Sequence, residues 1–191
     1  MKRQFNTALK FLALMIILTG VLYPGLVTAI TSLFFPEKAG GSLVERNGTV
    51  TGSKLIGQNF DSQKYFWSRP SFNNYNSLPS GASNLGLLNP HLTEDIIQRE
   101  QAFLQTNKMK DNLKIPPEML TASASGLDPH ISPAAALLQL TRVAKARGMD
   151  KNKQHQIIGL INDMTEKRQF SLLGEPRINV FLLNLKLDSL K

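Results

Sequence analysis

The 191-residue sequence contains no cysteine and only three histidines. Without cysteine the chain cannot form a disulfide, hold a cysteine-ligated zinc ion or iron–sulfur cluster, or use a thiol nucleophile. None of the histidines (His91, His130 and His155) has a second histidine at HxH or HxxxH spacing. We therefore expect no metal site.

Acidic residues are also scarce, because 14 Asp and Glu stand against 22 Lys and Arg, for a formal net charge of +8. With 42% hydrophobic and 19% charged residues, the chain is neither disordered nor a membrane protein with several spans. Lys2, Arg3 and Lys10 gather at the N-terminus, and the other cations are interspersed with acids. We therefore expect no nucleic-acid partner.

No charged residue lies between Lys10 and Glu37. At about 1.5 Å per residue, a helix over residues 11–35 exceeds the ~30 Å of a hydrocarbon core. We predict a transmembrane helix there, with residues 1–10 in the cytoplasm by the positive-inside bias and residues 36–191 outside the cytoplasm. A cleaved signal peptide is the alternative, because Val27-Thr28-Ala29 has the small-residue spacing of a cleavage site.

Two small residues, Gly25 and Ala29, stand four apart on one face of this helix. Such a pair allows close approach of another helix, although small residues are also simply tolerated in membrane helices. Pro24 lacks a backbone N–H, so we expect it to bend or loosen the helix locally.

The remaining chain predicts one α+β domain outside the cytoplasm. Asn47-Gly48 between strand-like runs predicts a β-hairpin, and Tyr65-Phe66-Trp67 predicts a short strand that ends at Pro70. Three helices are predicted: one capped by Thr93, one from Ser132 to a stop at Gly148, and one capped by Asp150. The apolar segment 178–187 predicts a buried strand.

Three groups of residues could carry function. The aromatic segment beside Arg69 is more often half-buried core with a capping cation than a base-stacking surface. Asp128 and His130 follow Ser123 and Ser125, which permits a catalytic triad, but a self-bonded turn that starts the next helix is far more common. Gln139 and Arg142 share a helix face and Arg147 points elsewhere; a solvated face is the common explanation, and contact with a partner or an anion is the alternative.

Several blocks together resemble the C subunit of the potassium-transporting P-type ATPase, the KdpC family. They are the N-terminal span with Tyr23-Pro24-Gly25, GSKLIGQNF (52–60), YFWSRPS (65–71), SGASNLGLLNP (80–90), TASASGLDPHISPAAALLQLTRVAKARG (121–148) and INVFLLNLKLD (178–188). The most specific part is SGLDPHISP followed by QxxRVAxARG, although Thr141 stands where the family often has proline.

The resemblance implies a noncatalytic accessory subunit of a high-affinity potassium uptake complex in the bacterial inner membrane. It implies three partners: a channel-like potassium-binding subunit, a P-type subunit that hydrolyses ATP, and a small single-span subunit. ATP and potassium would be handled by the complex, and this chain would bind no cofactor itself. Family members are described as catalytic chaperones that raise ATP affinity.

We expect partner contacts among six polar residues: Arg69, Asp128, His130, Gln139, Arg142 and Arg147. Two other functions remain open, an independent membrane-anchored hydrolase and a basic binding module.

Overall fold

The computed structural model describes residues 1–110 and 113–190 and divides the chain into two compact units, Met1–Ser53 and Lys54–Lys191. The hairpin that follows the apolar helix lies in the first unit. The division by internal contacts therefore falls later in the chain than residue 36, where we placed the start of the outer domain. The second unit holds the mixed helix and strand structure, as the α+β prediction requires.

The first unit begins with a continuous apolar helix over Lys2–Phe34, long and apolar enough to cross a membrane. It comprises α1 (Lys2–Ile17), the π-helical turn η1 (Leu18–Leu22) and α2 (Tyr23–Phe34), and none of its residues is buried. The Tyr23 N–H donates to the carbonyl of Leu18, five residues back. This wider turn directly precedes Pro24, so the predicted local loosening is confirmed.

A short helix and the hairpin complete the first unit. They are α3 (Pro36–Ala39), β1 (Leu43–Arg46) and β2 (Thr49–Ser53), with the two strands antiparallel. Asn47 and Gly48 form the turn with φ of 54° and 76°. Two positive φ angles are what a type I′ hairpin turn requires, so the predicted hairpin is confirmed.

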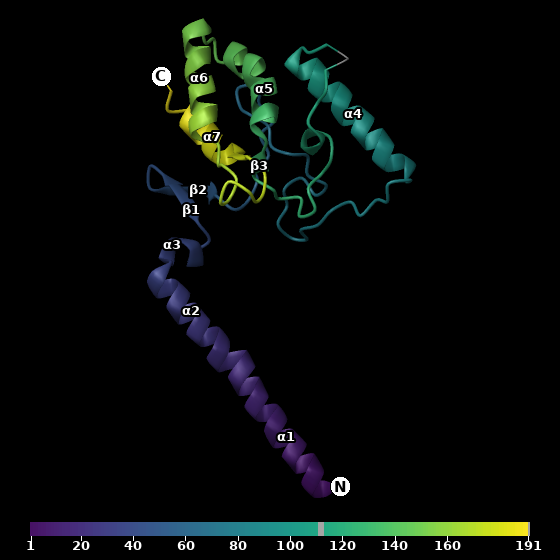
Figure 1. Ribbon diagram of the computed structural model, residues 1–191, viewed down its shortest axis with the longest axis vertical. Coiled ribbons are helices and arrows are strands. Elements are labelled where there is room, and N and C mark those ends of the chain that lie inside the picture. The colour runs from purple at the N-terminus through teal and green to yellow at the C-terminus, as the bar shows by residue number, and fades with distance from the viewer. Residues whose placement is uncertain (111–112, 191) are drawn as a thin grey trace. The chain divides into compact units, whose positions relative to one another are not determined.

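The regular secondary structure of the second unit is mainly helical, and long loops connect it (Figure 1). It contains α4 (Pro90–Asn107), the 3-10 turn η2 (Pro117–Met119), α5 (Pro133–Ala146), α6 (Lys151–Asp163) and α7 (Val180–Leu187). Helix α5 packs on α4 and α6, and α6 packs on α7. Strands β3 (His130–Ile131) and β4 (Ile178–Asn179) form a two-stranded antiparallel pair.

The starts of α5 and α6 follow the predicted signals. The Ser132 hydroxyl accepts from the N–H of Ala135 at 3.1 Å, and the Asp150 carboxylate accepts from the N–H of Lys153 at 2.8 Å. Gly148 has a φ of 65° just beyond α5, which confirms the predicted stop.

The predicted cap at Thr93 is wrong. Helix α4 begins at Pro90, and the Asn89 side chain accepts from the N–H of His91 at 3.0 Å. Pro90 suits the first helical position because its missing N–H would have no partner there. The start therefore lies one turn earlier than the acidic residues at 94 and 95 indicated.

The predicted strand over 178–187 is also wrong beyond its first two residues. Asn179 accepts from the N–H of Leu182 at 3.1 Å and thereby caps α7. Val180, Leu183 and Leu187 are fully buried at helical spacing. Burial of this face in the core outweighs the β-propensity of the segment.

Candidate functional site

Two side-chain amides hold the aromatic segment at 66–67. The Asn184 amide accepts from the Phe66 N–H at 2.8 Å and donates to the Phe66 carbonyl at 2.9 Å. The Gln139 amide does the same for Trp67, at 2.7 and 3.3 Å. These amides from α7 and α5 take the place of a neighbouring strand. The predicted strand at 65–67 is therefore wrong, since its backbone partners are side chains.

Arg142 binds the same segment through backbone carbonyls and the Trp67 ring. Its Nη1 donates to the carbonyls of Gln63 and Tyr65 at 2.8 and 3.0 Å, and its Nε donates to Asn107 Oδ1 at 2.9 Å. The guanidinium lies 4.4 Å from the centre of the Trp67 ring. Burial lowers the pKa of Arg142 to about 10, so it stays charged at neutral pH.

The solvated helix face expected at Gln139 and Arg142 is wrong, because their exposed fractions are 0% and 5%. Arg142 Nη2 also donates to Gln139 Oε1 at 2.8 Å, which joins the two side chains. Both therefore bind groups of their own domain. The expectation of half-buried aromatic core is confirmed, with Phe66 fully buried and Trp67 partly so, and Arg142 is the cation over the Trp67 ring.

Arg147 also binds within the domain. Its Nη2 lies 2.7 Å from Asp188 Oδ1, and its Nε donates to the carbonyl of Lys64 at 2.7 Å. The guanidinium stands 5.0 Å from the Tyr65 ring centre, and the Tyr65 hydroxyl donates to Asp188 Oδ2 at 3.2 Å. Arg147 thus joins the end of α5, the aromatic segment and the end of α7.

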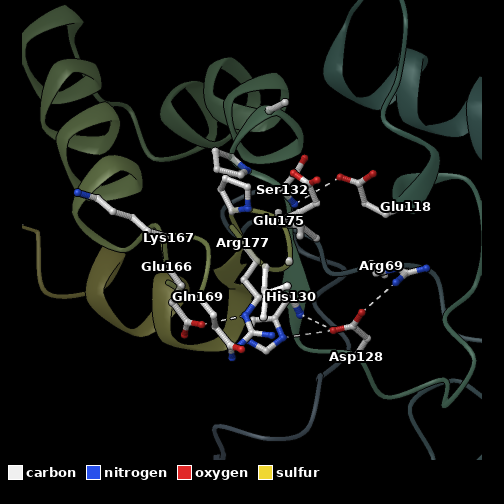
Figure 2. Close-up of a pocket in the computed structure, with 16 residues that line it drawn as sticks. Arg69, Glu118, Asp128, His130, Ser132, Glu166, Lys167, Gln169, Glu175 and Arg177 are labelled. Carbon is white, nitrogen blue, oxygen red and sulfur yellow. Dashed lines mark hydrogen bonds and ion pairs between the residues drawn. The ribbon is translucent and has the colours of Figure 1, made fainter. Parts of the chain in front are cut away.

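Arg69, Asp128 and His130 come together at a partly exposed charged cluster (Figure 2). Arg69 Nη1 is 2.9 Å from Asp128 Oδ2, and the backbone N–H of His130 donates to Asp128 Oδ1 at 3.0 Å. Burial alone would raise the pKa of Asp128, but hydrogen bonds from His130 and Arg69 outweigh it and lower the pKa to about 2. Asp128 is therefore a carboxylate at any physiological pH.

The cluster lines a cavity of about 720 Å³. Figure 2 shows Asp128 between Arg69 and His130, with Arg177 and Glu166 across from them. The Glu118 carboxylate accepts from the N–H of Ser132 at 3.3 Å on another wall. Charges of both signs line this cavity: Arg69, Glu118, Asp128, Glu166, Lys167, Glu175 and Arg177. Such a lining suits polar groups of a partner better than one small apolar ligand.

The loop before α5 is the self-bonded turn that we expected. Ser125 Oγ accepts from the N–H of Leu127 at 3.1 Å, and Ser123 Oγ accepts from the N–H of Asp128 at 3.5 Å. Their hydroxyls thus serve the loop backbone, and Ser132 caps the helix that follows. Among the described residues, no hydrogen bond links either loop serine to His130.

At two glycines, this loop and an earlier segment of the chain approach too closely to leave room for a Cβ atom. A Cβ on Gly57 would lie 2.7 Å from the carbonyl oxygen of Asp128. Gly126 has a φ of 70°, and a Cβ there would lie 2.5 Å from Asn73 Oδ1. Nearby, the Tyr75 hydroxyl donates to the carbonyl of Arg69, and burial raises the pKa of Tyr75 to about 12. These contacts position Arg69 and Asp128 relative to each other.

The family model described as "KdpC: K+-transporting ATPase, c chain" matches residues 5–189. The chain belongs to the KdpC family. A KdpC subunit of a potassium-transporting ATPase from Polynucleobacter asymbioticus is 48% identical, covering 98% of this chain and 99% of the relative. One from Paraburkholderia phytofirmans is 45% identical over 100% and 99%, and one from Herpetosiphon aurantiacus is 46% identical over 100% and 98%. The resemblance found in the sequence is confirmed.

In this KdpC-family chain, the two most specific sequence blocks meet the rest of the domain at different places. The SGLDPHISP block supplies Asp128 and His130 to the charged cavity, and the QxxR block supplies Gln139 and Arg142 to the aromatic segment. Whether any of these residues contacts a partner stays a prediction. Sequence reasoning missed Asn107 and Asn184, whose only signal is an asparagine within an otherwise apolar or helical run.

Proposed function

We propose that this chain is a noncatalytic accessory subunit of an ATP-driven potassium transporter in the bacterial inner membrane, needed for assembly and stability of the complex. The family match over residues 5–189 carries the proposal, because it includes both the apolar helix and the following domain. The match to the relatives named as KdpC subunits covers 99% of their own length.

We place Lys2, Arg3 and Lys10 in the cytoplasm, the apolar helix in the membrane and residues 36–191 outside. The support is the positive-inside bias and the absence of buried residues along the helix. N-terminal sequencing of the mature protein tests this anchor against the signal-peptide alternative. A mature chain that starts at Ile30 would contradict the anchor.

The partners in this proposal are the channel-like subunit, the ATP-hydrolysing subunit and the small single-span subunit. The outer domain would lie at or near the ion entrance of the channel-like subunit and stabilise the complex there. In this proposal only residues 1–10 of the chain lie in the cytoplasm. Any effect of the chain on ATP affinity therefore reaches the hydrolysing subunit indirectly, through contacts between subunits. Labelling of this chain by azido-ATP in correctly oriented vesicles would contradict that route.

The deciding experiment is extraction of the tagged full chain from native membranes in mild detergent. We expect the ATP-hydrolysing and channel-like subunits to co-purify, with ATPase activity that potassium stimulates. A chain that keeps residues 1–53 and lacks residues 54–191 should lose high-affinity potassium uptake. Unchanged uptake by that truncated chain would contradict a role for the outer domain.

A further inference from the structure

A hairpin-like arm over residues 165–177 connects α6 with β4. Its first bridge joins Glu166 and Arg177, whose backbones exchange hydrogen bonds of 2.8 and 3.1 Å. A second bridge joins Gln169 and Leu173, with two hydrogen bonds of 2.9 Å. Paired backbone groups at two levels make this arm a structured element rather than a loose connection.

The tip of the arm exposes three large apolar side chains. Phe170, Leu172 and Leu173 have exposed fractions of 88%, 80% and 61%. The turn that presents them holds Phe170 and Ser171 at φ of 52° and 61°, a conformation that residues other than glycine adopt at a cost. Contiguous exposed apolar groups mark interaction sites, whereas single exposed leucines do not.

The charges on the arm are largely paired with one another. Arg168 Nη2 lies 2.6 Å from Glu175 Oε2, and Arg177 Nε lies 2.9 Å from Glu166 Oε2. Lys167 adds one further cation. Attraction to an anionic lipid surface depends on several uncompensated cations, which this arm does not offer. The charge pattern therefore favours a polypeptide over a membrane as the occupant.

The surface next to the tip is polar and carries both signs of charge. Leu173, Glu175 and Arg177 of the arm line the cavity that also contains Arg69 and Asp128 (Figure 2). An apolar anchor beside a rim of polar and charged groups is the common composition of a protein–protein interface. The anchor and the rim belong to one continuous surface of the second unit.

We propose that the arm docks this chain onto another subunit of the transporter: Phe170 and Leu172 enter an apolar hollow on that subunit, and the charged cavity binds polar groups around the hollow. The proposal rests on the proposed function, since it takes the occupant to be a subunit of the same complex. It adds the element that makes the contact and the chemistry of the surface that receives it.

Site-specific photo-crosslinking in native membranes tests the contact. A photoreactive amino acid is placed at position 170 of the full chain, and a matched chain carries it at position 78, because Leu78 is a single leucine, 82% exposed, on a different loop. We expect cross-linking at 170 to a co-purifying subunit, several-fold above the yield at 78. Cross-links to lipid only, to a second copy of this chain only, or with equal yields at both positions would overturn the proposal.

A double variant, Phe170→Ser with Leu172→Ser, gives a second readout. Removal of anchor side chains from an interface should speed dissociation of the chain from the detergent-solubilised complex by roughly tenfold or more. Leu78→Ser is the control and should dissociate at the wild-type rate. If the wild-type chain co-purifies with no ATPase subunit, the proposed function fails; if it co-purifies and the double variant dissociates normally, the arm proposal alone fails.

Discussion

At the scale of single residues, Arg142 organises the domain through acceptors that are not carboxylates. Its guanidinium bonds two loop carbonyls and the Asn107 side chain, and the Trp67 ring lies against it. A buried cation with no acidic partner among the described residues needs such a set of oxygen acceptors and a π-face to offset the loss of water. Arg142 therefore couples helix α5 to a loop nearly eighty residues earlier in the chain.

Arg142→Met should lower the free energy of unfolding by about 3 kcal/mol, because several buried acceptors lose their donor at ~1–3 kcal/mol each. Urea-induced unfolding of the full chain in detergent, followed by fluorescence of Trp67, measures this. Arg177→Met is the matched control, since that arginine is in an exposed ion pair, and should change stability by less than about 1 kcal/mol. Equal effects of the two substitutions would contradict the role of Arg142.

Asp128 should make stability depend on pH in acid. Its pKa in the folded chain, about 2, lies below the ordinary value of 3.8, so the folded state favours the carboxylate. The resulting stabilisation is present above pH 4 and is lost as the pH falls toward 2. We expect a loss on the order of 1–2 kcal/mol over that window in acid titrations of unfolding. Asp128→Asn should remove this part of the pH dependence; an unchanged profile would contradict it.

At the scale of elements, the loop before α5 is held by backbone approach as well as by side chains. The Gly57 N–H donates to the carbonyl of Leu127 at 2.8 Å. A Cβ at position 57 would meet the backbone of Asp128 at 2.7 Å, and neither segment can yield without moving Asp128 from Arg69. The loop conformation that forms the charged cavity thus depends on a residue seventy positions earlier.

Gly57→Ala should destabilise the domain by about 1–3 kcal/mol, the usual cost of an overpacked site. Gly81→Ala is the control: a Cβ there meets no atom within 4 Å, and its φ is not positive. Thermal unfolding of both full-length variants in detergent measures the difference. If Gly57→Ala unfolds at the same temperature as Gly81→Ala, the close approach at position 57 does not contribute to stability.

The helix starts show which elements sequence reasoning can predict. Ser132 and Asp150 were identified correctly because a cap acts on backbone groups only two or three residues away. The strand predicted at 65–67, and the strand predicted at 178–187 beyond its first two residues, failed for the opposite reason. Phe66 in the first segment bonds Asn184 in the second, 118 residues later in the chain. Contacts over such a distance leave no signal in the local sequence.

At the scale of the whole molecule, the chain combines an unburied apolar helix with a folded domain that has its own core. An apolar helix with no buried residue can cover its surface with lipid or with other helices. Gly25 and Ala29 offer the face that we expect another helix to contact. Apart from the neighbouring helix backbone, no atom of the described residues lies within 4 Å of a Cβ placed at Gly25.

Gly25→Leu combined with Ala29→Leu should therefore leave this chain folded and weaken its association with the complex. The expected result is at least a severalfold lower yield of co-purifying ATPase subunits after mild detergent extraction. Gly20→Leu is the matched control, because Gly20 also has no atom within 4 Å of an added Cβ and stands outside the four-residue pair. Equal co-purification from the double variant and the control would contradict packing at Gly25 and Ala29.

The apolar helix, the hairpin turn, the starts of α5 and α6, and the family are all predictable from the amino-acid sequence, because each depends on local patterns or on ordered blocks of residues. Three features become visible only in the folded chain: the burial of Gln139 and Arg142, the pairing of the aromatic segment with side-chain amides, and the helix at 180–187. The tertiary structure also decided which charged residues meet at the cavity beside the arm. These outcomes depend on contacts between residues far apart in the chain, whose energies no local pattern contains.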